Sequence, residues 1–157
     1  MTSSEGDQIG RAFRAGLLFV SYRPRSRQEI RRRLGRRFGA RTVELALARL
    51  EEQGYVDDAT FARFWRESRE AHRPRSAGLI RRELAQRGVG REVAEEAVAG
   101  LDDDANAYRA GLGRMRSLGG LEYVTFHRRL EGYLRRRGFG TGVVRRAVER
   151  LWREHLS

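Results

Sequence analysis

Apolar residues recur three or four positions apart along most of this chain, which is the spacing of one face of an α-helix. Phe13, Leu17 and Val20 show this spacing near the N-terminus, and Leu47 and Leu50 show it again further on. Alternation with a period of two, which would indicate a β-strand, never persists. The pattern therefore predicts an all-α protein built from short helices.

A repeat of 50 residues organises these helices. The tetrapeptide Arg-Pro-Arg-Ser occurs at residues 23–26 and again at residues 73–76. An apolar pair with a spacing of four follows each copy, and a further shift of 50 finds the same pair without the tetrapeptide. Periods of this length are typical of stacked supersecondary units that bury their apolar faces against one another. The three pairs are Ile30 with Leu34, Ile80 with Leu84, and Leu130 with Leu134.

We expect each copy to contribute three short helices, which gives three tandem three-helix repeats in an elongated, modular array. The predicted boundaries are a disordered tail over residues 1–8 and repeats over residues 9–54, 55–101 and 102–157. In the third repeat, the first helix is expected to continue through Met115.

Polar residues stand where the second helix of each repeat should begin. Ser26 and Glu29 form a capping box, in which the serine hydroxyl accepts from a first-turn amide and the glutamate reaches back. Ser76 is the expected cap of the equivalent helix in the second repeat. Thr125 is the expected cap in the third repeat, where the tetrapeptide is missing.

Two acidic clusters could suggest a metal or catalytic site. Asp57 and Asp58 are adjacent, and residues 102–104 are three consecutive aspartates. Both clusters precede predicted helices, so we interpret them as helix caps, because consecutive carboxylates without other ligands hold a cation poorly. No zinc-binding helix, phosphate-binding loop or nucleophile motif is present in the sequence. We therefore expect no catalytic residue, no metal, no cofactor and no enzymatic activity.

Charge is the strongest compositional signal in the 157 residues. The net charge is +12, and such a field attracts polyanions, above all nucleic acid. All 33 basic residues are arginine, which suits bidentate contacts to phosphate or carboxylate, although the codon usage of a GC-rich genome explains it equally well. The absence of cysteine, of a signal peptide and of a long apolar run leads us to expect a cytoplasmic protein without membrane contact.

The positive charge is concentrated in the outer repeats. Residues 1–53 contain 12 arginines and 6 acidic residues, a net charge of +6. Residues 54–104 contain 9 arginines and 11 acidic residues, a net charge of −2, and residues 105–157 contain 12 and 4, a net charge of +8. We interpret the outer repeats as the binding parts and the middle repeat as a spacer.

In their order and spacing, these motifs resemble the RecX family, bacterial regulators of the RecA recombinase. The resemblance implies tandem three-helix repeats and a negative modulator that settles along the groove of the RecA filament on DNA. It further implies restraint of strand exchange, ATP hydrolysis and co-protease activity. The first repeat departs from the family pattern at the turn Arg37-Phe38-Gly39, which lacks a glycine before its hydrophobe. The matching residues are Arg25–Ile30 with Leu34, Leu50, Gly54–Asp58 with Phe61 and Ala62, Ile80, Glu83 and Leu84, Arg87–Val89, and Leu134–Phe139.

Arginines that avoid the apolar faces are the candidate binding residues for a RecA filament or for DNA. Alternatively, they form a solvated helix surface, and the run at residues 135–137 favours the dipole at a helix end. A general DNA-binding protein with a helix-turn-helix in each repeat is the other functional hypothesis. We expect a monomer with weak, non-specific affinity for single- or double-stranded DNA alone. The candidates are Arg31, Arg32, Arg36, Arg37, Arg81, Arg82, Arg87, Arg128, Arg129, Arg135, Arg136, Arg137, Arg145 and Arg146.

Overall fold

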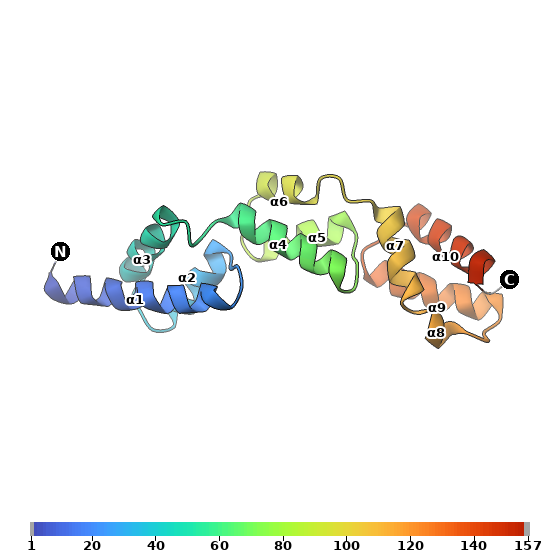
Figure 1. Cartoon of the computed structure of the whole chain (residues 1–157), viewed down its shortest axis with the longest axis horizontal. Helices are drawn as coiled ribbons and strands as arrows, with labels where there is room; N and C mark the ends of the chain where they lie inside the picture. The colour runs from blue at the N-terminus through green and yellow to red at the C-terminus, as the bar shows by residue number, and fades with distance from the viewer. Residues whose placement is uncertain (1, 156–157) are drawn as a thin grey trace. The chain divides into compact units, whose positions relative to one another are not determined.

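The computed structural model describes residues 2–155, which contain ten α-helices and no β-strand (Figure 1). The prediction of an all-α fold is confirmed. The helices are α1 (Ser3–Tyr22), α2 (Arg27–Gly35), α3 (Ala40–Glu52), α4 (Asp58–Ala71), α5 (Ala77–Gln86), α6 (Arg91–Val98), α7 (Asp103–Leu112), α8 (Met115–Leu118), α9 (Tyr123–Arg136) and α10 (Thr141–His155).

Helices α1, α2 and α3 pack around one apolar core. Leu34 of α2 and Leu50 of α3 are almost completely buried, so the apolar positions of the repeat do face this core. Gly16 of α1 lies so close to α3 that a Cβ atom on it would be 2.6 Å from Cδ1 of Leu50. The small residue therefore allows α1 and α3 to approach each other.

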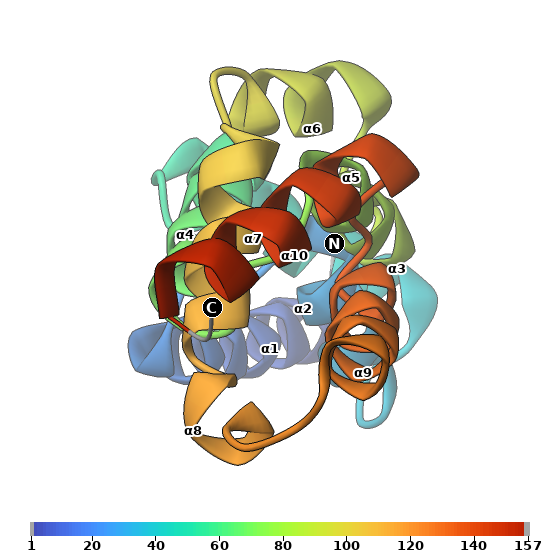
Figure 2. The same cartoon turned by 90° about the vertical axis from the view of Figure 1, so that its right-hand side faces the viewer.

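Helices α7, α9 and α10 pack around a second core, and the short α8 lies in the connection from α7 to α9 (Figure 2). Leu130 and Leu134 of α9 and Leu151 of α10 are fully buried. Gly111 of α7 approaches α10 so closely that a Cβ atom on it would be 2.5 Å from Cδ1 of Leu151. Gly16 and Gly111 thus occupy equivalent positions in the first and third triplets of helices.

Helices α4, α5 and α6 form the middle triplet, whose residues are divided between two compact units. One unit comprises the residues up to Trp65 together with Leu84–Ala97, and the other comprises Arg66–Glu83 together with the residues from Val98 onward. The division falls inside α4 and α5. The repeat boundaries drawn from the sequence thus describe a periodicity, and their role as folding boundaries stays a prediction.

The start of α2 is completed by residues of the middle triplet. Within α2, the Glu29 N–H donates to the Ser26 hydroxyl over 3.1 Å, and the Ser26 N–H donates to the Glu29 carboxylate over 2.9 Å, which confirms the capping box. The Ser26 hydroxyl also donates to the carbonyl of Arg87 over 2.8 Å. The carboxylate of Asp58, at the start of α4, accepts from the N–H of Arg27 over 2.8 Å. One triplet therefore supplies a cap to the preceding one.

The start of α5 repeats this arrangement with residues of the third triplet. Ser76 caps α5 as predicted, because its hydroxyl accepts from the N–H of Leu79 over 3.0 Å. The N–H of Ser76 donates to the carbonyl of Arg137 over 3.0 Å. The carboxylate of Asp103 accepts from the N–H of Ala77 over 2.9 Å. The serine of the repeated tetrapeptide is therefore the point where the turn of the next triplet docks.

A glycine turn makes this docking possible in the middle and third triplets. Gly88 and Gly138 have φ angles of +82° and +90°, which residues with a Cβ atom rarely adopt. A Cβ atom on Gly138 would also lie 2.5 Å from Oγ of Ser76 and 2.6 Å from Cβ of Leu79. Phe38 stands 50 residues before Gly88 and has no left-handed φ, so the departure seen in the sequence changes the turn.

The prediction of a disordered tail over residues 1–8 is wrong for the residues that the structure describes. Helix α1 begins at Ser3, because Thr2 and Glu5 form a second capping box. The Thr2 hydroxyl accepts from the Glu5 N–H over 3.1 Å, and the Glu5 carboxylate accepts from the Thr2 N–H over 2.9 Å. Small polar residues were interpreted as a tail although they carry a helix start signal. Met1 lies outside the described residues.

Two predictions about the third triplet are also wrong. Its first helix does not continue through Met115, because α7 ends at Leu112 and a glycine-containing turn leads into the single turn of α8. Thr125 does not cap α9, which begins two residues earlier at Tyr123. Its N-cap is Glu122, whose side chain makes no capping hydrogen bond. Without the tetrapeptide, sequence spacing alone placed this helix start too late.

Candidate polyanion-binding surface

The 14 candidate arginines lie mostly at the surface, as a binding role requires. Arg31, Arg87 and Arg137 are half-buried, and the other 11 are exposed. They come from the second helix of each triplet or the turn after it, and from α10. Their surroundings divide them into three groups.

The first group is held by carboxylates of the same chain. Arg31 donates to both oxygens of Glu44 over 2.6 and 3.3 Å, and this hydrogen bonding raises the pKa of Arg31 and lowers that of Glu44. Arg135 pairs with Glu131 over 2.9 Å, and Arg146 pairs with an oxygen of Asp104 over 2.9 Å. A partner must compete with these carboxylates for the three arginines.

The second group rests on aromatic rings. The guanidinium carbon of Arg87 lies 3.9 Å from the centre of the Trp65 ring. The guanidinium of Arg137 lies 5.1 Å from the ring of Tyr133. The guanidinium of Arg37 lies 5.4 Å from the ring of its neighbour Phe38. Such cation–π contacts orient these guanidinium groups without neutralising their charge.

The third group has no ion pair with any carboxylate of residues 2–155. All of its members are exposed, so their charge is available to a partner. Its members are Arg32, Arg36, Arg81, Arg82, Arg128, Arg129, Arg136 and Arg145.

One contact between the first and second helices recurs in the outer triplets with different chemistry. Phe19 and Arg114 each lie three residues after the equivalent glycines at positions 16 and 111. Phe19 of α1 meets Arg33 of α2, whose guanidinium lies 5.1 Å from the ring centre. Arg114 meets Tyr133 of α9, with its guanidinium 4.9 Å from that ring centre. The arginine is on the second helix in the first triplet, whereas in the third triplet the second helix carries the aromatic residue and the turn after α7 carries the arginine.

In the middle triplet the corresponding contact is an ion-pair cluster. Arg69 of α4, 50 residues after Phe19, pairs with Glu83 of α5 over 3.3 Å. Arg75 of the second tetrapeptide pairs with the same carboxylate. The side chains of Arg75 and Glu83 are only 17% and 12% exposed, and burial lowers the pKa of Arg75. Glu83 therefore places a carboxylate at this contact in the middle triplet and compensates part of its positive charge.

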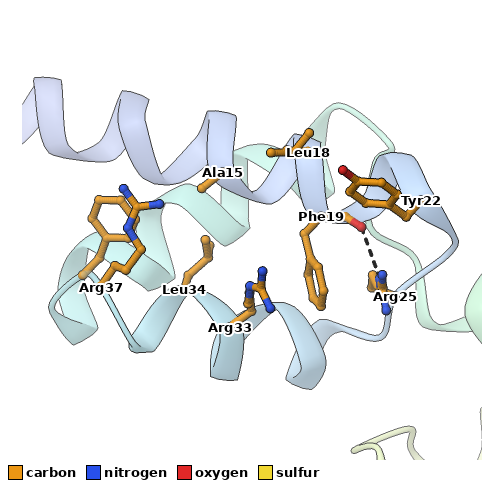
Figure 3. Close-up of a pocket in the computed structure, with 9 residues that line it drawn as sticks. Ala15, Leu18, Phe19, Tyr22, Arg25, Arg33, Leu34 and Arg37 are labelled. Atoms are coloured by element: carbon orange, nitrogen blue, oxygen red, sulfur yellow. Dashed lines mark hydrogen bonds between the residues drawn. The ribbon is translucent and has the colours of Figure 1, made fainter.

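The first of the two outer contacts borders a cavity of about 330 Å³, which we call the N-terminal cleft. Figure 3 shows Phe19 reaching from α1 between Arg25 and Arg33. Arg25 donates to the carbonyl of Phe19 over 3.2 Å, and burial, followed by the charge of Arg23, lowers the pKa of Arg25. The cleft is lined by Ala15, Leu18, Phe19, Tyr22, Arg25, Arg33, Leu34, Arg37 and Phe38.

The second outer contact borders a cavity of about 440 Å³, which we call the C-terminal cleft. Arg114 precedes α8, and the other charged lining residues come from α9. None of the described residues that line it is acidic. The lining residues are Arg114, Ser117, Leu118, Arg128, Arg129, Gly132, Tyr133 and Arg136.

The clefts contain arginines that sequence reasoning both found and missed. Arg128, Arg129 and Arg136 were candidates and meet in the C-terminal cleft. Arg33 was missed because the residues 50 and 100 positions later are glutamate and tyrosine, so arginine does not recur at this position of the repeat. Arg114 was missed because it stands in a glycine-containing turn, outside the predicted second helix. Its equivalence to Phe19 becomes visible only when Gly111 is aligned with Gly16 of α1.

The acidic clusters have structural roles. Asp57 accepts from the N–H of Ala59 over 3.1 Å, and Asp102 caps α7 through the N–H of Ala105. Among residues 2–155, no three histidine, cysteine, aspartate or glutamate side chains gather where they could hold a metal ion. Within the same residues, none of the helices combines the length and the apolar character that crossing a membrane requires.

The fold and the arginines together define a helical-repeat protein with a strongly basic exterior. Models of the first and second three-helix domains of RecX match residues 12–50 and 57–98. The chain is 35% identical over 144 residues to the regulatory protein RecX of Prosthecochloris aestuarii, a match that covers 90% of this chain and 93% of that protein. It is likewise 35% identical over 146 residues to the regulatory protein RecX of Thermobifida fusca, with 90% and 79% covered. The chain belongs to the RecX family of regulatory proteins.

A solved structure agrees with this assignment at the level of the fold. The crystal structure of RecX from Lactobacillus salivarius matches with a TM-score of 0.77 over 93% of this chain and 97% of that one, at 17% identity. Helices α7 to α10 lie outside the two ranges matched by the domain models, yet they fall within the length that the structural match largely covers.

Proposed function

We propose that this protein is a negative modulator of the RecA recombinase. It binds the RecA–DNA filament along its groove and inhibits strand exchange, ATP hydrolysis and co-protease activity. Membership of the RecX family supports the regulatory role. The partners in this proposal are the RecA filament and its DNA, and the protein acts in the cytoplasm as a monomer.

The observation that carries the proposal is the set of eight exposed arginines without a carboxylate partner among the described residues. They recur on the second helix of all three triplets, so they offer cations at several points along the chain. A filament repeats its own acidic protomer surfaces and its DNA phosphates. Weak contacts made at several points gain strongly from multivalency.

The proposed mechanism is a shift of a binding equilibrium and needs no catalytic step. A ligand that binds one filament state better than another shifts the population towards the state it prefers. The protein would stabilise an inactive state of the filament or occupy the path of a second DNA. The eight exposed arginines without a carboxylate partner among the described residues support such a contact with an anionic surface.

The direct test measures hydrolysis of ATP by RecA on single-stranded DNA, and strand exchange, at increasing concentrations of this protein. We expect both to fall, and unchanged rates at saturating protein would refute the proposal. Arg32→Glu with Arg36→Glu should raise the concentration needed for inhibition roughly tenfold, because two contacts to charged groups are reversed. Arg11→Glu with Arg14→Glu, an equal change of charge on exposed residues of α1, is the matched control.

A general DNA-binding protein is the second candidate, and the helix pairs joined by a glycine turn favour it. In that function the protein would place a helix in the major groove of a specific sequence. Titration of labelled DNA duplexes of different sequence without RecA separates the two functions. Tight, sequence-dependent binding supports this candidate, whereas weak binding that fades with the logarithm of salt concentration indicates electrostatic attraction alone.

A further inference from the structure

The C-terminal cleft gathers four arginines on one side of the third triplet. Arg114 comes from the turn before α8, and Arg128, Arg129 and Arg136 come from α9. The cavity between them has a volume of about 440 Å³. The hydroxyl of Ser117 also lines it and donates to the carbonyl of Arg114 over 2.9 Å, which fixes the turn that carries this arginine.

The charge of these four arginines is uncompensated. None of them forms an ion pair with a carboxylate of residues 2–155. Their neighbours on the same triplet differ, since Arg135 pairs with Glu131 and Arg146 pairs with Asp104. Like charges around one cavity repel each other, and the repulsion is stronger where the protein displaces water. An anion in the cavity would remove this cost.

Tyr133 and Gly132 shape the cavity. The ring of Tyr133 has the guanidinium groups of Arg114 and Arg137 at 4.9 and 5.1 Å from its centre, so it orients cations. Glycine inside a helix costs about 1 kcal/mol relative to alanine, so its presence at position 132 calls for a reason. A Cβ atom there would meet only Nη1 of Arg136, at 3.2 Å. Gly132 leaves the floor of the cleft open.

We propose that the C-terminal cleft is a phosphate-binding site that accepts several phosphate groups in series. Positions 129 and 136 are separated by about 10 Å along α9, so the arginines can contact successive anions of one chain. The planar guanidinium fork matches phosphate oxygens, and no lysine replaces it here. Every linkage of a nucleic acid carries a charge, so one strand supplies anions in series. The phosphates come from a nucleic-acid backbone or from a free polyphosphate such as a nucleoside triphosphate.

This inference assigns one set of arginines to phosphate binding and so deepens the proposed function. The role of the phosphate site in the cell rests on that proposed function. The N-terminal cleft does not share the assignment. Its wall includes Leu18 and Tyr22, which are 62% and 75% exposed, and its arginines surround a phenylalanine. Of these two clefts, the C-terminal one is lined by four arginines, and the rest of its described lining is Ser117, Leu118, Gly132 and Tyr133.

The test uses the full chain without RecA and a fluorescein-labelled oligothymidylate, with binding followed by anisotropy over a salt series. Arg129→Gln with Arg136→Gln should weaken binding roughly a hundredfold, because two hydrogen-bonded contacts to charged phosphate groups are lost. The slope of log K against log salt should fall by about 1.4, since each phosphate contact on a single strand contributes about 0.7. Arg11→Gln with Arg14→Gln removes the same charge from exposed residues of α1 and should change affinity less than twofold.

A second variant separates the shape of the cleft from its charge. Gly132→Leu fills the floor and retains every arginine, and it should weaken binding to a similar extent. Helicity and thermal unfolding of each variant are checked by circular dichroism, and the double glutamine variant keeps the test decisive if Gly132→Leu does not fold. Equal losses in the cleft and control variants would overturn the proposal, because they indicate diffuse attraction. Full binding of both oligothymidylate and tripolyphosphate by a folded Gly132→Leu would overturn it too.

Inorganic tripolyphosphate, titrated by calorimetry, distinguishes the two sources of phosphate. Loss of oligothymidylate binding in the cleft variants assigns the site to a nucleic-acid backbone. Loss of tripolyphosphate binding alone assigns it to a free polyphosphate, and loss of neither overturns the site. The proposed function is tested independently of the phosphate site. If wild-type protein leaves ATP hydrolysis by RecA unchanged, the regulatory function is refuted, but the phosphate site is not.

Discussion

The two clefts are built at the same place in their triplets, yet they present different chemistry. In the N-terminal cleft an aromatic residue of the first helix, Phe19, meets an arginine of the second, Arg33. In the C-terminal cleft the turn after α7 supplies Arg114 and the second helix supplies Tyr133. The first cleft has exposed apolar side chains on its wall, and the second is lined by four arginines. Equivalent positions in a repeat can thus carry different binding functions.

The middle triplet explains why the difference does not disturb the fold. There the same contact is closed by Glu83, which pairs with Arg69 and Arg75. The apolar pairs are buried in all three triplets, and the docking serines Ser26 and Ser76 are present with both the aromatic and the ion-pair contact. The fold is set by the buried positions, and the half-buried contact beside them is free to vary.

The largest effect is expected from Gly138→Ala. This variant tests whether the stability of the third triplet depends on docking of the turn after α9 on Ser76. The variant combines a left-handed φ, worth about 1–2 kcal/mol, with a Cβ atom that collides with Ser76 and Leu79, worth about 1–3 kcal/mol. We expect a loss of about 3 kcal/mol in the free energy of unfolding by urea. Gly54→Ala has a similar φ and no neighbour within 4 Å, so it should lose only the backbone part. Equal losses would show that the collision is relieved.

Glu83→Gln removes the carboxylate from the contact between α4 and α5 in the middle triplet. Arg69 and Arg75 then lose their ion pairs with this carboxylate, and Arg75 is partly buried. We expect a loss of about 2 kcal/mol in stability, below the range for fully buried pairs because all three side chains keep some exposure to water. The matched control, Glu131→Gln, breaks a more exposed pair and should lose less than about 1 kcal/mol.

The same variant should also bind oligothymidylate several-fold more tightly, because the middle triplet gains net positive charge at one point. Anisotropy measured beside Glu131→Gln, which changes the net charge equally, separates the local effect from the global one. Identical gains in both variants would show that the net charge of the chain, and not the position of Glu83, sets the affinity.

Leu18→Ser with Tyr22→Ser changes the wall of the N-terminal cleft and spares every arginine. Both side chains are exposed, so stability should change little. If the clefts bind different ligands, oligothymidylate binding stays within twofold of wild type. Inhibition of RecA should require several-fold more protein, because burial of such side chains on binding contributes free energy. A matching loss of oligonucleotide affinity would mean that the clefts act as one surface.

Arg136→Glu and Arg135→Glu test the effect of intramolecular pairing at adjacent positions. Arg136 lines the C-terminal cleft, whereas Arg135 is held by Glu131. We expect Arg136→Glu to weaken binding to the RecA filament and to oligothymidylate about tenfold, and Arg135→Glu to weaken it about threefold at most. Both reverse one charge, so a pull-down with RecA filaments compares them directly. Equal effects would argue for net charge alone.

The smallest effect is expected from pH at the pair of Arg31 and Glu44. Hydrogen bonding lowers the pKa of Glu44 below its ordinary value of 4.5, so the pair stabilises the fold fully above that value. Its contribution is lost as the pH falls through the lowered folded pKa. The side chains are 41% and 49% exposed, and water screens the pair, so the loss should be a few tenths of a kcal/mol. Thermal melts of wild type and Arg31→Gln between pH 5 and 3 should show it as a flatter pH dependence in the variant.

Much of the fold could be predicted because its signals are local. The apolar pair Ile30 and Leu34 and the capping box at Ser26 depend on spacings within one helix turn. The pairing of Arg135 with Glu131 is also local, at a spacing of four, and could have been inferred. Local spacing did not predict the correct first residue of α9, because no serine marks the start of that helix.

The candidate site was less predictable because its members meet only in the folded chain. Arg31 and Glu44 are 13 residues apart, and Arg146 and Asp104 are 42 apart, so their pairing could not be inferred from helix spacing. The 50-residue repeat identified the arginines that recur at equivalent positions. It could not identify Arg114, whose place depends on where α7 ends.

The caps that one triplet supplies to the preceding one also give the chain a direction during synthesis. The start of α2 receives its last hydrogen bonds from Asp58 and Arg87, and the start of α5 waits for Asp103 and Arg137. Since the ribosome delivers the N-terminal residues first, each triplet emerges before the residues that complete it. A ribosome stalled after residue 101 would therefore hold a middle triplet whose α5 lacks two of its partners, although every residue of that helix has been made.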